Sequence, residues 1–154
     1  MRSGLCIALS ACLSLALVTS AAAAPDPCSL LTPAQVGAAV GTPVGAGVGT
    51  STGHTCTWKA TDGGASGVVY ATLFLQSGES YEAGRKLATQ MGGQAVVPVS
   101  GVGDSAYYFV TGSTAGLLAR KGGSAFKAAV YGSAPLERKK AMEKALASAV
   151  VGKL

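Results

Sequence analysis

The sequence predicts an α+β fold, in which an antiparallel sheet of about five strands carries three helices packed largely on one face, with one disulfide. Three observations lead to this class. Several short segments alternate apolar and polar residues, which is typical of half-buried strands. Three other stretches repeat their apolar residues at helical spacing. Glycine-rich turns too short for a crossover helix separate the last strands, which favours antiparallel pairing.

Residues 1–23 are predicted to be an export signal. Arg2 supplies the positive charge, Leu5 to Val18 form an apolar run too short to span a bilayer as a stable anchor, and small residues follow at Ala21 to Ala24. A cut after Ala22 or Ala23 leaves one secreted α+β domain over residues 24–154.

A lipoprotein is the alternative, because Leu9-Ser10-Ala11-Cys12 fits a lipobox and a lipid on Cys12 would tether the chain to a membrane. We favour the unlipidated form, since cleavage before Cys12 would follow a very short apolar segment. Either way the mature chain is expected outside the cytoplasm, in the periplasm or at the cell exterior, with no transmembrane span.

Without Arg2 the chain has 11 Lys and Arg against 7 Asp and Glu, a net charge of +4. This balance can favour an anionic envelope component as partner. Nucleic acid is not expected, because no dense basic stripe with interleaved aromatic residues occurs. The mature chain keeps two cysteines, Cys28 and Cys56, and in an oxidising compartment they are predicted to pair. That bridge is expected to stabilise the fold by roughly 3 to 4 kcal/mol.

The first predicted helix begins after Thr32, which can cap it, with Pro33 at its first position and Gln35 completing a capping box; Gly41 ends it. The glycine-rich stretch 41–53 is predicted to be a loop or a weak edge strand. Further strands are predicted at residues 54–59, 68–75, 106–110, 115–121 and 124–131, with a short extended piece at 95–99 and helices at 80–91 and 135–151.

Three motifs resemble the landmarks of the domain of unknown function 3558, a family of mostly actinobacterial secreted proteins and lipoproteins. They span Pro27 to Val36 (PCSLLTPAQV), Cys56 to Trp58 (CTW) and Val102 to Tyr108 (VGDSAYY). The resemblance implies an α+β envelope domain with a disulfide, and it implies no catalytic residue. Many members carry a clear lipobox at the end of the signal, whereas this chain has only the early Cys12.

Catalytic and metal chemistry find little support in the residues. His54 is the one histidine, and a hydrolase would need it beside a serine and Asp62 or Asp104, without a Gly-x-Ser-x-Gly elbow. The scattered carboxylates form no metal-ligand spacing, and the glycines at 45, 47 and 49 lack the Lys-Ser/Thr of a phosphate loop. We therefore expect no metal, no cofactor and no enzymatic activity.

Two features are the candidates for ligand binding. The loop from Gly101 to Asp104 precedes a strand with Tyr107 and Tyr108, of which one is expected to be exposed; the simpler interpretation is a tight turn in which Asp104 bonds nearby amides. Cations at Arg120 and Lys121, and at Arg138, Lys139 and Lys140, are expected to be solvated or to form an anion-facing patch. The sequence thus favours a non-enzymatic extracytoplasmic binding or interaction module. A small secreted hydrolase using His54 and a structural envelope component remain as alternatives.

Overall fold

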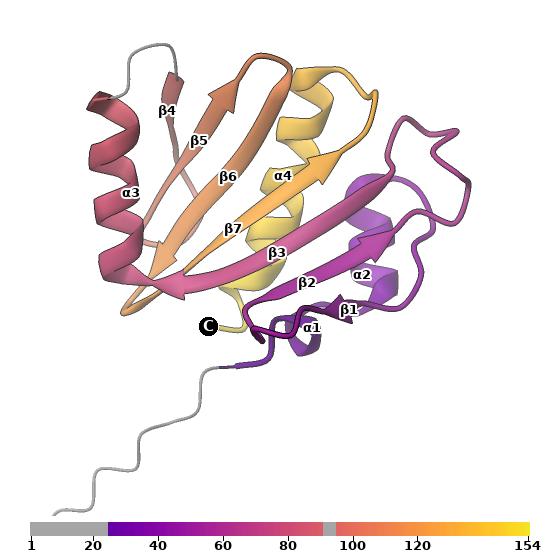
Figure 1. Cartoon of the computed structure of the whole chain (residues 1–154), viewed down its shortest axis with the longest axis horizontal. Helices are drawn as coiled ribbons and strands as arrows, with labels where there is room; N and C mark the ends of the chain where they lie inside the picture. Colours follow the sequence, from indigo (N-terminus) through magenta and orange to yellow (C-terminus); the bar gives the residue numbers. More distant parts are fainter. Residues whose placement is uncertain (1–24, 91–94) are drawn as a thin grey trace, which may run out of the picture.

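The computed structural model describes residues 25–90 and 95–154, so the predicted signal segment and Cys12 lie outside the described residues. The described chain forms one antiparallel sheet in the order β1-β2-β3-β7-β6-β5-β4 (Figure 1). The strands are β1 (Val48–Gly49), β2 (Thr55–Lys59), β3 (Tyr70–Ser77), β4 (Ala95–Val99), β5 (Ser105–Thr111), β6 (Thr114–Lys121) and β7 (Ser124–Tyr131). The helices are α1 (Pro27–Leu30), α2 (Pro33–Val40), α3 (Gly78–Gln90) and α4 (Leu136–Val151).

The α+β class and the antiparallel sheet are confirmed, but the expected number of about five strands is wrong, because the sheet has seven. The two additional strands are its edges. β1 forms where a loop or weak edge strand was the prediction, and β4 forms from the short extended piece. Each pairs on one side only, β1 with β2 and β4 with β5. Edge strands of this kind have weak sequence signals because one side of their backbone has no partner strand.

The expectation that the helices pack largely on one face also needs correction. The main core joins α1, α2 and α4 to one face of the sheet, through residues such as Val36, Leu73 and Leu146. A second cluster of Tyr81, Tyr107 and Ala125 lies on the opposite face, under α3. On that face α3 contacts β4, β6, β7 and the end of β3 that runs into it, so β2 and the rest of β3 and β7 have no helix of the described chain above them there.

The centre of the sheet is a long-range pairing. β3 pairs with β7 from Tyr70↔Tyr131 to Ser77↔Ser124, and with β2 on its other side. Both faces of the segment at 68–75 are rich in apolar residues, a pattern that favours such a central position. The pairing brings the two halves of the chain into one sheet.

β6 and β7 separate partway along their length. Their register begins at the hairpin pair Lys121↔Ser124 and ends at Leu117↔Ala128, so the last residues of β7 have no partner on β6. Figure 1 shows the two strands diverging, with α4 lying behind the sheet at this place. The helix therefore supplies contacts to both strands where they no longer bond each other.

The local signals around α2 are confirmed in detail. The Thr32 hydroxyl accepts a hydrogen bond from the Gln35 backbone at 3.2 Å, and the Gln35 side chain accepts one from the Thr32 backbone at 3.0 Å. Gly41 ends the helix with φ +71°, in the left-handed region that glycine adopts without strain. The capping box and the glycine thus set both ends of this short helix.

Candidate ligand site

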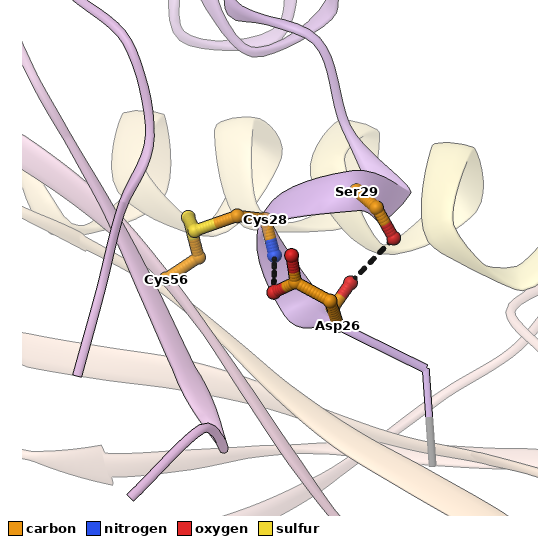
Figure 2. Close-up of a disulfide and its surroundings, with 4 residues drawn as sticks. All are labelled: Asp26, Cys28, Ser29 and Cys56. Carbon is orange, nitrogen blue, oxygen red and sulfur yellow. Dashed lines mark hydrogen bonds between the residues drawn. A yellow bond between two sulfur atoms is a disulfide. The ribbon is translucent and has the colours of Figure 1, made fainter. Parts of the chain in front are cut away.

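The predicted disulfide is present and joins α1 to β2. Cys28 and Cys56 are bonded to each other (Figure 2). Asp26 caps the start of α1, because its carboxylate accepts a hydrogen bond from the Cys28 backbone N–H at 2.9 Å. Gly47 crosses directly above the bridge. A Cβ at Gly47 would lie 2.6 Å from Cys56 Sγ and 2.7 Å from Trp58 Nε1, so this crossing requires glycine. The disulfide is thus a structural link, with Cys56 fully buried and Cys28 half-buried.

The loop from Gly101 to Asp104 is held by structural contacts. Val102 is buried, the Asp104 backbone donates to the carbonyl of Arg120 at 2.8 Å, and the Asp104 carboxylate accepts from the Gly122 backbone at 2.7 Å. This last bond, followed by the nearby cations of Lys121 and Arg120, lowers the pKa of the Asp104 carboxyl below its ordinary value. Asp104 therefore fastens the β6–β7 turn, as expected for the simpler interpretation.

Neither tyrosine of β5 is exposed, which corrects the expectation that one would be. Tyr107 lies under α3 and Tyr108 under α4, because helices cover both faces of this strand. The Tyr108 hydroxyl donates to the Lys140 carbonyl at 2.6 Å. Burial, with Glu143 and Glu137 nearby, raises the pKa of Tyr108 to about 12. This side chain holds α4 against the sheet.

The five cationic residues predicted as a possible anion-facing patch do not lie together on the surface. The backbone of Arg120 lies near Val151, at the end of α4, as the close approach of both to Gly103 shows. Arg138 is 13 residues earlier in that helix, which at 1.5 Å per residue is about 20 Å away. Their charges also have partners nearby: Lys121 has Asp104 at 3.8 Å and Lys140 has Glu137 at 2.8 Å.

Lys139 is not part of a solvated surface at all. It is 5% exposed, and its ammonium group donates to the Ser113 carbonyl in the β5–β6 turn at 2.7 Å. One turn further along α4, the fully buried Glu143 accepts a hydrogen bond from the Val130 backbone of β7 at 3.1 Å. These two side chains bond α4 to the β5–β6 turn and to the end of β7, where β7 no longer pairs with β6.

Glu143 carries a strongly perturbed carboxyl group that the sequence prediction missed. Burial raises its pKa to about 7, against the opposing effects of the Val130 amide and the cations of Lys127, Lys139 and Lys140. Its second oxygen has no hydrogen-bond partner among the described residues. Helical periodicity contained a signal for it, because positions 139 and 143 continue the buried stripe of Leu146 and Val150.

An open cavity lies at the junction of β3, α3 and β7, with a volume of about 640 Å³. β3 runs directly into α3 at this end of the sheet (Figure 1). Part of the lining is apolar and part is polar but uncharged. The lining residues are Pro25, His54, Phe74, Leu75, Gln76, Ser77, Ser80, Gly123, Ser124, Ala125 and Leu154.

His54 reaches this cavity, but the acids predicted as its partners do not. Neither Asp62 nor Asp104 lines the cavity. The carboxylate of each accepts hydrogen bonds elsewhere in the fold. Asp62 accepts bonds from the Thr42 side chain and the Gly64 and Ser66 amides, of which the Gly64 bond does most to lower its pKa to about 2. Within the described residues, the imidazole of His54 has no hydrogen bond to a serine or a carboxylate. The structure thus does not assemble a Ser-His-Asp site there.

Beside the cavity lies the part of the sheet that α3 leaves uncovered. Phe74, which is 38% exposed, lies next to Lys127 on β7, while Tyr70 and Tyr131 stack with ring centroids 4.6 Å apart. Phe74 thus belongs both to this open face and to the cavity lining.

Within residues 25–90 and 95–154, no helix is long and apolar enough to cross a membrane. The same part of the chain holds no group of three or more His, Cys, Asp or Glu side chains placed to hold a metal ion. Comparison with family models, curated proteins and solved structures finds no match to this chain. The resemblance to the domain of unknown function 3558 therefore stays a prediction that rests on its three motifs.

Proposed function

We propose that this chain is an extracytoplasmic, non-enzymatic binding module and that its ligand enters the cavity between β3, α3 and β7. The observation that carries the proposal is the cavity itself. Its volume of about 640 Å³ falls within the range of small-molecule sites, roughly 300 to 1,000 Å³. The disulfide and the predicted signal segment support the location outside the cytoplasm.

The cavity walls belong to well-anchored elements, as a preformed site requires. The Leu75 backbone donates to the His54 carbonyl at 2.8 Å, and the Gly78 backbone donates to the Gly123 carbonyl at 2.9 Å. These bonds join β3 to the start of β2 and α3 to the turn before β7. A ligand there would not have to order a free loop on binding, which reduces the entropy cost of association.

Because the predicted cations lie apart, an anionic envelope component has only a minor role as a partner in this proposal. An anionic polymer would meet Arg120 and Arg138 on distant parts of the surface, and would have to compete with Asp104 and Glu137 for Lys121 and Lys140. Such contacts are weak and are screened by salt at physiological ionic strength.

The test uses the exported protein labelled with ¹⁵N, titrated with soluble fragments of digested cell envelope. We expect amide signals of Phe74, Ser77 and Ser124 to shift while the fragments stay chemically unchanged. Fragments cleaved by the wild type and not by His54→Ala would establish the hydrolase alternative. If no amide signal of a cavity residue shifts with any of the envelope fragments, the binding module is refuted and the structural envelope component is favoured.

A further inference from the structure

The chemistry of the cavity lining points to a ligand class. We propose that the cavity binds a neutral sugar unit of an envelope glycan, an inference that rests on the proposed binding function. No Lys, Arg, Asp or Glu side chain lines the part of the cavity formed by the described residues, and His54 is the one titratable side chain there. An anionic ligand would lose its hydration without gaining an opposite charge from these side chains, which is costly. The hydroxyl and apolar side chains of the lining favour a neutral ligand.

One wall of the cavity offers neutral hydrogen-bonding groups. The hydroxyls of Ser77 and Ser80 lie 3.1 Å apart, and Ser124 faces Ser77 across the β3–β7 pair. Hydroxyl groups donate and accept at once, so adjacent serines suit the vicinal hydroxyls of a sugar ring. Gln76 adds a donor, because its Nε2 is buried without a hydrogen-bond partner among the described residues. A side-chain rotation would present this group to a ligand oxygen.

The cavity lining also holds apolar side chains and an aromatic ring. Phe74 is 38% exposed although it lies in the middle of the sheet, and Leu75, Ala125 and Leu154 border the same space. A sugar ring has an apolar C–H face that packs on an aromatic side chain and polar edges that bond hydroxyls. A lining that holds both an aromatic ring and hydroxyl groups can meet both of these features.

Strand pairing argues against a bound peptide. Peptides commonly add a strand to a free sheet edge, but β3 is paired with β7 up to Ser77 and with β2 up to Phe74, and Leu75 also bonds His54. Only Gln76 and Ser77 extend beyond β2 on that side. This length is too short for strand addition, so the site recognises side-chain-sized groups and not an extended backbone.

The experiment titrates the ¹⁵N-labelled exported protein with a panel of neutral trisaccharides (chitotriose, maltotriose, cellotriose and mannotriose). Trigalacturonate and a blocked tri-alanine peptide serve as the charged and peptide probes. We expect one neutral trisaccharide to shift the signals of Phe74, Ser77 and Ser124 saturably, with a Kd that does not change with salt.

The matched variants are Phe74→Ala, which removes the aromatic ring of the lining, and Leu87→Ala, which removes another exposed apolar side chain, on α3 and outside the cavity lining. Phe74→Ala is expected to weaken trisaccharide binding at least fivefold, and Leu87→Ala to leave it unchanged. Equal losses in both variants would contradict a site at the cavity.

Two further outcomes separate the ligand class from the proposed function. If only tri-alanine or trigalacturonate saturates the cavity signals, the sugar class is wrong and the binding module stands. If the trisaccharides, both other probes and the crude envelope digest all leave those signals in place, the sugar class and the binding module fall together.

Discussion

The two faces of the central strands β3 and β7 differ sharply in burial, although alternating residues of the same two strands form both faces. On the face toward α2 and α4, Leu73 and Val130 are almost fully buried. On the other face, the neighbouring positions are Phe74, which is 38% exposed, and Tyr131, which is half-buried. Because side chains alternate along a strand, each β3 and β7 position belongs to one environment or the other.

This contrast shows that a strand with two apolar faces need not be buried on both. The apolar residues at 68–75 correctly predict a central strand, but on one face they remain partly open to solvent. Partly exposed aromatic residues on a rigid sheet are the usual material of a binding surface. The covered face therefore holds the fold together, while the uncovered face is available for a ligand.

Replacing a phenylalanine on each face tests this division most strongly. Phe126 is fully buried, and Phe126→Ala is expected to lower the free energy of unfolding by about 3 to 5 kcal/mol because it leaves a cavity in the core. Phe74→Ala, on the adjacent strand and the other face, is expected to cost less than about 1 kcal/mol. Urea unfolding of the three proteins measures both differences. Similar losses would show that the open face is as important to stability as the core.

The buried Glu143 predicts an unusual pH dependence on the covered face. Its pKa is raised from 4.5 to about 7, so the folded state binds this proton more tightly than the unfolded chain does. The resulting stability is fully present below pH 4.5 and is lost as the pH rises through 7. The loss is expected to be about 3 kcal/mol at most. Asp62, with its pKa lowered to about 2, gives the opposite slope but only at pH values below about 4.

Glu143→Gln tests this, because glutamine keeps an acceptor for the Val130 amide without the charge. We expect the variant to lose the decline in the free energy of unfolding between pH 5 and 8, and to be the more stable protein at pH 8. Glu137→Gln is the matched control, since Glu137 lies on the same helix with its side chain 81% exposed. A Glu143→Gln protein with the wild-type slope would show that Glu143 does not titrate in this range.

What the sequence could predict is mostly local. The cap at Thr32, the stop at Gly41, the alternation of Cys56 and Trp58 and the Cys28–Cys56 bridge depend on short-range patterns or on a single possible pairing, and the structure confirms them. The sheet order depends on pairing between β3 and β7, whose partner residues are 47 to 61 positions apart in the sequence, and periodicity does not encode such pairing.

The candidate site was harder to predict for the same reason. His54, Phe74 and Ser124 line one cavity only because three distant elements meet, and none of them stands in a motif with a known chemical spacing. The basic run at Arg138 to Lys140 is a motif in the sequence, but folding gives its members different environments. Charge runs therefore indicate a surface only after helical periodicity has been checked for each residue.

The smallest expected effect distinguishes two adjacent cations on α4. Lys139→Met keeps the apolar stem and removes the bond to the Ser113 carbonyl, which at a buried position is expected to cost about 1 kcal/mol. Arg138→Met changes an exposed side chain whose one contact, to the Ser66 carbonyl, is 3.4 Å long, and it is expected to change stability by less than about 0.5 kcal/mol. Thermal unfolding at fixed pH and salt compares them. Since Lys139 bonds α4 to the β5–β6 turn, a loss of anion binding in a Lys139 variant would report on folding as well as charge. Arg138 is therefore the residue to neutralise when testing an anionic partner, and equal destabilisation by the two variants would place Lys139 back on the solvated surface.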